Sequence, residues 1–425
     1  MPSLPYPHVC KSIRVLLGCL MLLLACKPSV RQAAQRTNQQ ESLGKPYVVL
    51  VSIDGFRHDY VQQHELKHFK QIAAEGVAAT AMVPAFPSKT FPNHYTIATG
   101  LYPEHHGIVA NTFYDPEKGQ TYRIRDREKV EDGSWYGGTP LWVLAEQQGM
   151  LAASFFWVGS EADVQGVRPT YYYRYDQSIP NETRVDQVID WLKMEESQRP
   201  HLITLYFSDI DSKGHDFGPG SPELAEALER MDRLIADLDQ KLQALDLPVN
   251  LIVTSDHGMT LVDQKHPIRL NEMIKLDDFQ PAPNGAMYML YAQDQQKIET
   301  AYHQLLPLAD RFDVYKKEDI PDYLHFRASN RIGDLLLIAH PPYIITDRPG
   351  IFPRSKGEHG YDPHEVEDMH TIFYAKGPAF KKGMLVPAFE NIHLYPLIAH
   401  ILQLTPPPTD GRLEVLKPVL AEENE

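Results

Sequence analysis

Cysteine is scarce in this sequence, and it is confined to the first 26 residues. The three cysteines are Cys10, Cys19 and Cys26. This distribution excludes a small scaffold that is held together by disulfide bonds. A chain of 425 residues, of which 43% are hydrophobic, can instead bury a sizeable core of its own.

The apolar run Val15–Ala25 is too short to span a bilayer, and it follows Lys11 and Arg14. These features are typical of a signal peptide, so we expect residues 1–25 to be removed. The run ends in Leu23-Leu24-Ala25-Cys26, which resembles a bacterial lipoprotein box, although leucine is not the favoured residue at its second place. Cys26 would then carry a lipid anchor. A plain secretory signal is the alternative.

An exported chain that keeps only Cys26 can form no internal disulfide bond, and this indicates a bacterial envelope. We therefore predict a periplasmic protein that is anchored to the membrane at Cys26. Residues 26–45 are rich in Ser, Gln and Asn and are expected to form a flexible tether. Residues 46–425 are expected to form the functional domain.

Positive charge is also in short supply. The chain has 41 Lys and Arg against 56 Asp and Glu, which gives a formal net charge of −15. A net acidic surface repels a phosphate backbone, so we expect no binding of nucleic-acid duplexes. The negative charge of any phosphate ligand then has to be compensated within the binding site, and a metal ion would do that.

From Pro46 onward, short β-branched apolar runs alternate with amphipathic stretches, a pattern typical of an α/β fold with a mostly parallel sheet. Between about residues 261 and 353 the pattern loosens, and we expect a smaller inserted cap subdomain there. The predicted strands are Tyr47–Ile53, Ala153–Trp157, Leu202–Phe207, Leu251–Thr254 and Thr371–Ala375, with Met287–Tyr291 and Asp334–Ile338 in the cap. The predicted helices are Asp59–Ala74, Thr183–Met194, Pro222–Leu245 and Asn391–Leu402.

Polar side chains follow the predicted strands at places where a parallel sheet binds ligands. Asp54 ends the first strand, and Asp211 and His215 follow the strand at 202–207 with the spacing of one helical turn. Asp256 and His257 are adjacent at a third strand end. Each could be structural: Asp54 could form an Asx-turn, and the Asp-His pair could be a hydrogen-bonded core couple.

His359 lies in Gly357-Glu358-His359-Gly360, where glycine lets the backbone bring the imidazole close to a ligand. His364 and His370 nearby are expected at the surface or behind the ligands. A mixture of carboxylate and imidazole ligands favours zinc over calcium or magnesium, and five or six ligands suit two ions. Two such ions are suited to phosphoryl transfer.

Thr90 offers a hydroxyl where a helix could begin, in Phe86-Pro87-Ser88-Lys89-Thr90-Phe91-Pro92. A threonine in this position is most often a helix N-cap, and that remains the alternative to a nucleophile. Lys89 could be a solvated side chain at the helix start, and we assign it no catalytic step.

Taken together, these segments resemble the nucleotide pyrophosphatase/phosphodiesterase family of the alkaline phosphatase superfamily, in order and from about Tyr47 to Leu404. The matching motifs are Ile53-Asp54-Gly55, Lys89-Thr90-Phe91-Pro92-Asn93-His94-Tyr95, Thr99-Gly100-Leu101-Tyr102-Pro103-Glu104-His105-His106-Gly107, Asp211-Ser212-Lys213-Gly214-His215, Ser255-Asp256-His257-Gly258-Met259 and Gly357-Glu358-His359-Gly360. The resemblance implies an alkaline-phosphatase-like core and two Zn²⁺ per subunit. One zinc would be held by Asp211, His215 and His359, and the other by Asp54, Asp256 and His257.

The same resemblance implies that Thr90 contacts zinc, attacks phosphorus and forms a covalent phospho-threonine intermediate. Asn111 would donate to a non-bridging phosphate oxygen, although a lone loop Asn is more often a turn residue. Phe91 and Tyr175 would sandwich a nucleobase, with Trp157 shaping the same pocket; by composition alone, all three aromatics would be ordinary core residues.

The predicted activity is hydrolysis of nucleotide phosphodiester and pyrophosphate bonds. One alternative is an alkaline phosphate monoesterase, but the segment Val158–Asp163 offers acidic residues and no cation for the extra phosphate charge. A choline-type glycerophospholipid phosphodiesterase is a second alternative, because an aromatic pocket can hold a quaternary ammonium. A catalytically dead binding protein on the same fold is a third.

Overall fold

The computed structural model describes residues 36–350 and 352–422. The predicted signal peptide, Cys26 and the first part of the predicted tether lie outside the described residues. Within the described part of the chain, no helix combines the length and the apolarity that crossing a bilayer requires.

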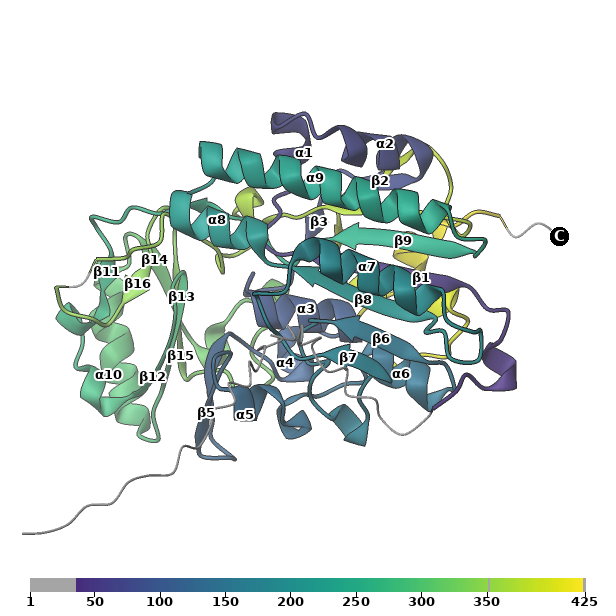
Figure 1. Cartoon of the computed structure of the whole chain (residues 1–425). Helices are drawn as coiled ribbons and strands as arrows, with labels where there is room; N and C mark the ends of the chain where they lie inside the picture. Colours follow the sequence, from purple (N-terminus) through teal and green to yellow (C-terminus); the bar gives the residue numbers. More distant parts are fainter. Residues whose placement is uncertain (1–35, 351, 423–425) are drawn as a thin grey trace, which may run out of the picture.

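An eight-stranded mixed sheet forms the centre of the molecule (Figure 1). Five neighbouring strands run parallel, and β18 is antiparallel to both of its neighbours. Every residue of β1 and β8 is buried, which is typical of parallel strands that are covered on both faces. In spatial order the strands are β19 (Met384–Val386), β2 (Val77–Ala79), β18 (Phe373–Lys376), β9 (Val249–Thr254), β1 (Tyr47–Ile53), β8 (Leu202–Phe207), β6 (Ala152–Phe155) and β7 (Tyr171–Tyr173).

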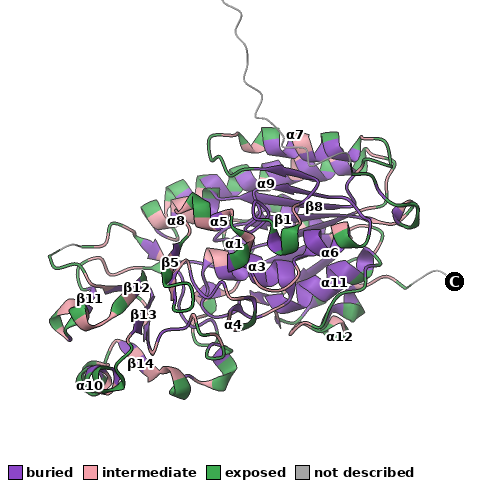
Figure 2. Cartoon of the chain, turned by 90° about the horizontal axis from the view of Figure 1, so that it is seen from below, coloured by how far each residue is buried: buried purple, intermediate pink, exposed green. Residues whose placement is uncertain are grey.

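Helices cover both faces of this sheet, and the side chains of β1 alternate between two hydrophobic cores. Val49 and Val51 pack with α2 (Lys67–Glu75), α7 (Asn181–Leu192) and α9 (Pro222–Gln243). Val48 and Leu50 face α3 (Thr90–Thr99), α6 (Leu141–Gln147) and α11 (Leu394–Ile401). Figure 2 shows the buried strands β1 and β8 between α7 and α9 on one side and α6 and α11 on the other.

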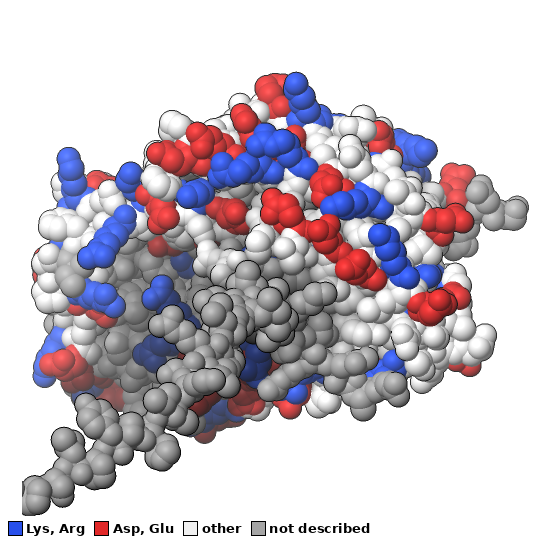
Figure 3. All heavy atoms as spheres, viewed as in Figure 1, with Lys and Arg blue, Asp and Glu red and all other residues white. Residues whose placement is uncertain are grey.

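The outer surface of α9 carries both signs of charge. Three pairs with helical i,i+4 spacing lie along it, Glu226–Arg230, Glu229–Arg233 and Asp237–Lys241. In Figure 3, acidic and basic side chains alternate over the face of the molecule that carries α8 and α9.

A second, four-stranded antiparallel sheet lies beside the carboxyl ends of the parallel strands (Figure 1). Its strands lie between β9 and β18 in the sequence, and the helix α10 (Gln295–Leu305) packs on one of its faces. Its other face shares a hydrophobic core with the hairpin of β4 (Thr112–Asp115) and β5 (Gln120–Arg123). In spatial order its strands are β12 (Gln280–Asn284), β13 (Met287–Tyr291), β15 (Leu335–Ala339) and β14 (Phe312–Lys316).

The remaining helices and strands are short. The helices are α1 (Tyr60–Gln63), α4 (Pro103–His106), α5 (Arg127–Val130), α8 (Asp209–Phe217) and α12 (Leu413–Leu416). Three two-residue strand pairs are β3 (Met82–Val83) with β20 (Phe389–Glu390), β10 (Thr260–Leu261) with β17 (Gly357–Glu358), and β11 (Ile268–Arg269) with β16 (Ile345–Thr346).

The α/β fold with a mostly parallel sheet is confirmed, and the predicted strands of the core occur within one or two residues of their expected bounds. One helix prediction was wrong: the pattern at 59–74 forms two helices, α1 and α2. Glu65 separates them with a φ of 51°, a left-handed conformation that no helix continues through. The segment for which a cap is predicted also contains the helix α10, which the sequence pattern did not reveal.

Candidate metal centre and active site

The chemistry-bearing residues converge at the carboxyl ends of three adjacent strands. Asp54 directly follows β1, Asp256 and His257 follow β9, and Asp211 and His215 lie one turn apart in α8, directly after β8. Because β9, β1 and β8 are parallel neighbours, these ends meet at one edge of the sheet. His359 reaches the same place from β17, where the chain returns from the second sheet.

The side chains form overlapping clusters whose potential ligand atoms lie within 4.8 Å of one another. His257 Nε2 lies 3.2 Å from Asp54 Oδ1 and 3.1 Å from Asp256 Oδ2. Asp211 Oδ1 lies 3.3 Å from His215 Nε2 and 3.7 Å from His359 Nε2. Three such groups occur among the described residues: Asp54, Asp256 and His257; Asp211, His257 and His359; and His215, Glu358 and His359.

Three of these carboxylates carry a buried oxygen that has no hydrogen-bond partner. The atoms are Asp54 Oδ1, Asp211 Oδ1 and Asp256 Oδ2. Burial of an unpaired charged oxygen is costly unless a cation compensates it. Since the orphaned oxygens face imidazole nitrogens in the same clusters, the residues fit the binding of divalent cations with a mixed oxygen and nitrogen donor set.

The ring orientation of all three histidines also suits metal binding. Nδ1 faces a backbone carbonyl in each case, namely Gly357 O for His215 (2.8 Å), Gly258 O for His257 (2.9 Å) and Ser88 O for His359 (2.9 Å). A carbonyl oxygen can only accept, so Nδ1 carries the proton. In the neutral ring Nε2 then carries the lone pair and faces the carboxylates, as metal-ligating histidines do. His257 and His359, whose pKa values are lowered, are in that state, whereas His215 has to release a proton first.

Burial and mutual proximity shift the pKa values of the cluster. Burial and the neighbouring carboxylates raise the pKa of Asp54 and of Asp256 well above the usual value. Burial opposes charge on His215, but the Asp211 carboxylate outweighs it and raises the pKa of His215 to about 10. Burial lowers the pKa of His257 to about 3 and that of His359 well below its usual value.

The Thr90 hydroxyl faces this cluster from the first residue of α3. The N-cap of that helix is Lys89, so Thr90 is not the capping residue. Thr90 Oγ1 lies 3.1 Å from His257 Nε2. Asn111 Oδ1 accepts a hydrogen bond from the backbone N–H of Phe91 at 3.0 Å, which leaves the amide NH₂ group of Asn111 available as a donor beside Thr90.

A cavity of about 300 Å³ opens next to Thr90. Phe91, Trp157 and Tyr175 are among the residues that line it. Tyr175 is 41% exposed, whereas Trp157 is buried and donates its indole N–H to the carbonyl of His94 at 3.0 Å. The rings of Phe91 and Tyr175 can thus contact a ligand, whereas the buried Trp157 forms part of the cavity wall.

The environment of Glu161 differs from the one that the sequence suggested. Glu161 is buried in the cavity wall, where it pairs with Arg127 and accepts the backbone N–H of Tyr175 at 3.1 Å. Arg125 and Arg127 line the same cavity. The argument that an uncompensated acidic segment repels a monoester is therefore wrong, because Arg127 arrives from a distant part of the chain and balances the Glu161 charge.

Lys89 is not a solvated side chain at the helix start, because it is buried and pairs with Glu358 at 2.8 Å. Two further residues that support the site, Tyr206 and His94, were not predicted from the sequence. Tyr206 donates its hydroxyl to Asp54 Oδ2 at 2.6 Å. His94 contacts both Thr90 and Asp256. The position of His94 one helical turn after Thr90 was the available signal. His364 is exposed, and His370 bonds to the carbonyl of Pro363.

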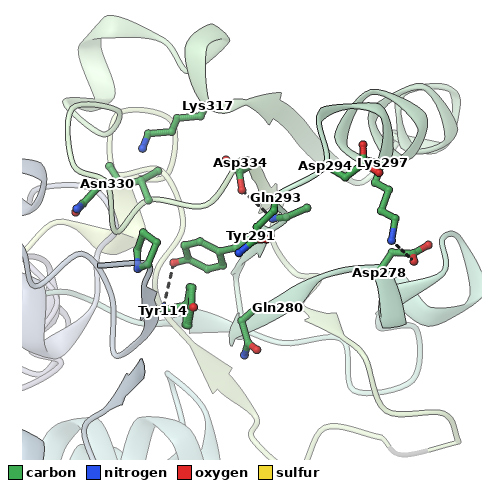
Figure 4. Close-up of a pocket in the computed structure, with 13 residues that line it drawn as sticks. Tyr114, Asp278, Gln280, Tyr291, Gln293, Asp294, Lys297, Lys317, Asn330 and Asp334 are labelled. Atoms are coloured by element: carbon green, nitrogen blue, oxygen red, sulfur yellow. Dashed lines mark hydrogen bonds and ion pairs between the residues drawn. The ribbon is translucent and has the colours of Figure 1, made fainter. Parts of the chain in front are cut away.

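A larger cavity of about 590 Å³ lies between the β4–β5 hairpin and the second sheet (Figure 4). Its charged side chains bond to neighbouring groups: Lys297 to Asp278 at 2.8 Å, Lys317 to the carbonyl of Ser329, and Asp334 to the backbone N–H of Ala292. The groups that line this cavity are thus largely satisfied, unlike the orphaned carboxylates at the strand ends.

Comparison with known proteins identifies a family. The sequence model of "type I phosphodiesterase / nucleotide pyrophosphatase" matches residues 48–362. Human ectonucleotide pyrophosphatase/phosphodiesterase family member 5 is 34% identical over 367 residues, which are 86% of this chain and 76% of that protein. Human member 1 is 36% identical over 381 residues, and the chain spans only 41% of its length.

Solved structures agree with these matches. An inactive variant of murine ectonucleotide pyrophosphatase/phosphodiesterase 5 in complex with AMP superimposes with a TM-score of 0.84 at 32% sequence identity, covering 89% of this chain and 100% of that one. Human ectonucleotide pyrophosphatase/phosphodiesterase 5 gives a TM-score of 0.84 at 33% identity and covers 88% of this chain. The fold is therefore that of an alkaline-phosphatase-like α/β core with a smaller inserted unit.

Proposed function

The chain belongs to the type I phosphodiesterase / nucleotide pyrophosphatase family, and from that premise we propose that it is a phosphoric diester hydrolase that binds two zinc ions and cleaves nucleotide phosphodiester and pyrophosphate bonds. The observation that carries the proposal is the position of the Thr90 hydroxyl, 3.1 Å from His257 Nε2, between the ligand clusters and an aromatic cavity.

The proposal places two cations in two sets of ligands. Asp54, Asp256 and His257 would hold one and Asp211, His215 and His359 the other, with Thr90 next to the first. When bound, such cations lower the pKa of a hydroxyl and stabilise the charge on a leaving oxygen. The mixture of carboxylate and imidazole donors is the one that zinc prefers.

The positions of Thr90 and Asn111 support a reaction in two steps. Thr90 Oγ1 attacks phosphorus and a bond from this oxygen to phosphorus forms, while the bond from phosphorus to the leaving oxygen breaks. The proton that the threonine hydroxyl loses ends on the leaving oxygen. Water then attacks the phospho-threonine, which releases the monophosphate and restores the hydroxyl. The free NH₂ group of Asn111 donates to a non-bridging oxygen, where negative charge builds up during both steps.

A nucleotide is the substrate that the cavity fits best. Phe91 and Tyr175 line it and can stack on a base, and a related murine protein was solved with AMP. The related proteins from snake venom are named phosphodiesterases, which supports the same reaction class.

We also propose export to a bacterial envelope, with Cys26 as a lipid anchor. The sequence of the first 26 residues supports the envelope and the anchor. The related human and snake proteins are named ectonucleotide or venom enzymes, which supports export alone. Labelling of cells with a radioactive or clickable fatty acid would test it, because a Cys26→Ser variant should lose the label and leave the membrane fraction.

The test of the activity compares catalytic efficiencies of the zinc-loaded protein and a chelated control. The substrates are a thymidine p-nitrophenyl phosphodiester, bis-p-nitrophenyl phosphate and p-nitrophenyl phosphate. We expect preference for the diesters, greatest for the nucleotide, and loss of activity with the chelator. Preference for the monoester would identify a phosphatase and contradict the proposal.

The nucleophile is tested by Thr90→Ala. This variant should lose turnover while its zinc content stays close to that of the wild type, because the hydroxyl is not among the three ligands of either cluster. A variant that retains most of its activity would exclude Thr90 as the attacking group.

A further inference from the structure

His94 is a buried histidine that neither the metal clusters nor the reaction scheme uses. It lies in α3, one turn after Thr90, and its side chain is fully buried. Its Nδ1 lies 2.9 Å from the carbonyl oxygen of Thr90 and 3.2 Å from Asp256 Oδ2, and its Nε2 lies 2.8 Å from Ser52 Oγ. One ring thus contacts α3, the end of β9 and the strand β1.

The partners decide which ring nitrogen carries the proton. The carbonyl oxygen of Thr90 can only accept, so Nδ1 donates to it and faces Asp256 as well. Nε2 then accepts from the hydroxyl of Ser52. Both ring nitrogens of His94 therefore have a hydrogen-bond partner: Thr90 in the first turn of the same helix and Ser52 in β1.

The ring has little freedom to move. It contacts Trp157 and Tyr206 edge-on, both at a centroid distance of 5.2 Å, and the indole N–H of Trp157 bonds to the His94 carbonyl at 3.0 Å. Tyr206 in turn donates its hydroxyl to Asp54 Oδ2 at 2.6 Å. The His94 environment therefore reaches the carboxylates of two proposed ligands, Asp54 and Asp256.

We propose that His94 is a positioning residue: through Nδ1 it fixes the first turn of α3 against Asp256 and so holds the Thr90 hydroxyl at the attacking position. The inference rests on the proposed function, since it assigns His94 to the nucleophile of that site. A displacement of about 1 Å in an attacking group lowers a rate by about 10²-fold, so loss of this contact acts on kcat.

Two amide substitutions distinguish the contributions of the two ring nitrogens of His94 to catalysis. In His94→Asn the amide nitrogen takes the approximate place of Nδ1, and in His94→Gln it takes that of Nε2. A matched control is His106→Gln. His106 is also fully buried, bonds through Nε2 to Thr96 Oγ1 at 3.0 Å and packs edge-on against Tyr95. Its Nδ1 accepts the backbone N–H of Ile108 at 3.2 Å, so its hydrogen bonds reach neither Thr90 nor a proposed ligand.

The measurements are kcat and KM on a nucleotide p-nitrophenyl diester, zinc content, and thermal unfolding, all for the folded full-length protein. We expect His94→Gln to lose about 10²-fold in kcat, with KM changed by less than about threefold. Its zinc content should equal that of the wild type. His94→Asn should recover kcat to within about tenfold of the wild type, while His106→Gln lowers the unfolding temperature and keeps kcat.

Other results would overturn the inference. A His94→Gln variant with the kcat of the wild type would show that Nδ1 does not position Thr90. An equal loss of kcat in both His94 variants would show that the loss does not come from the Nδ1 contact. Loss of zinc from His94→Gln would show that His94 serves metal retention. A wild-type protein without zinc-dependent diesterase activity would overturn the proposed function itself, and this inference with it.

Discussion

Protons compete with the proposed cations for the ligand atoms of Asp54, Asp256 and His215. Burial and neighbouring carboxylates raise the pKa values of Asp54 and Asp256, so these two groups keep their protons to higher pH than an exposed carboxyl group does. Asp211 raises the pKa of His215 to about 10, so His215 holds a proton at neutral pH in the metal-free protein. A metal requires the deprotonated ligands. We therefore expect zinc binding to release protons and the zinc affinity to rise with pH, by about tenfold per pH unit for each proton released.

Calorimetric titration with zinc in buffers of different ionisation enthalpy measures this proton release directly. A signal that depends on the buffer between pH 6.5 and 8 would agree with the shifted pKa values. An affinity that is constant over this range would contradict them, because it would mean that the ligands are already deprotonated.

Tyr175 provides a separate prediction about substrate recognition. Its half-exposed ring lines the cavity beside Thr90, and stacking of a base on an aromatic ring contributes about 1–3 kcal/mol. Tyr175→Ala should raise KM for a nucleotide diester by about 5- to 150-fold and change kcat little. Bis-p-nitrophenyl phosphate, which has no base, is the matched control substrate, and an equal change in KM for both would argue against base stacking.

At the scale of elements, Gly55 determines how close α8 approaches the end of β1. Its φ of +73° is left-handed, and a Cβ there would lie 2.8 Å from Asp211 Cα. The backbone N–H of Asp211 also bonds to the carbonyl of Asp54 at 3.0 Å. The absence of a side chain at residue 55 therefore keeps two proposed ligands adjacent.

Gly55→Ala should lower both stability and zinc affinity, because the clash separates Asp54 from Asp211 in addition to the cost of the backbone strain, about 1–3 kcal/mol. Gly44→Ala is the control, since Gly44 has a φ of +76° and no atom within 4 Å of the added Cβ. We expect the control to lose some stability and to keep zinc. Denaturant unfolding and metal analysis measure the two effects, and equal zinc content in both variants would contradict the argument.

The strands of the core could be predicted from the sequence because they are continuous apolar runs that end in polar residues, as at Ile53-Asp54. The candidate ligands follow from those ends. The second layer of the site could not be predicted in this way, since Lys89 pairs with Glu358 across 269 positions and Arg127 with Glu161 across 34. Such contacts depend on how distant segments meet, which local patterns do not encode. The break between α1 and α2 likewise depends on one left-handed residue, Glu65.

At the scale of the whole molecule, the site lies between the parallel sheet and the second sheet. The carboxyl ends of β9, β1 and β8 point toward that second sheet, and His359 is delivered where the chain returns from it (Figure 1). The inserted unit therefore contributes to the site by fixing the return path of the chain. Its attachment to the core should matter for the metal centre as well as for stability.

Arg331 forms several of the contacts that attach the second sheet to the core. Its guanidinium pairs with buried Asp115 at 2.9 Å and donates to the carbonyls of Gly107 and Trp135 at 2.9 and 2.6 Å. It also lies over the rings of Phe113 and Trp135, so a residue of the second sheet's loop bonds to three segments of the core. Removal of one member of a buried ion pair leaves the other charge uncompensated and costs about 3–5 kcal/mol.

Arg331→Met should therefore lower the free energy of unfolding by about 3–5 kcal/mol and expose the junction to proteases. Arg327→Met is the matched control, because Arg327 lies four residues away and pairs with the exposed carboxylate of Asp322, a contact worth at most about 1 kcal/mol. Urea denaturation and limited proteolysis of the zinc-loaded protein measure both. If Arg331→Met is no less stable than Arg327→Met, the second sheet is held by its hydrophobic contact with the β4–β5 hairpin alone.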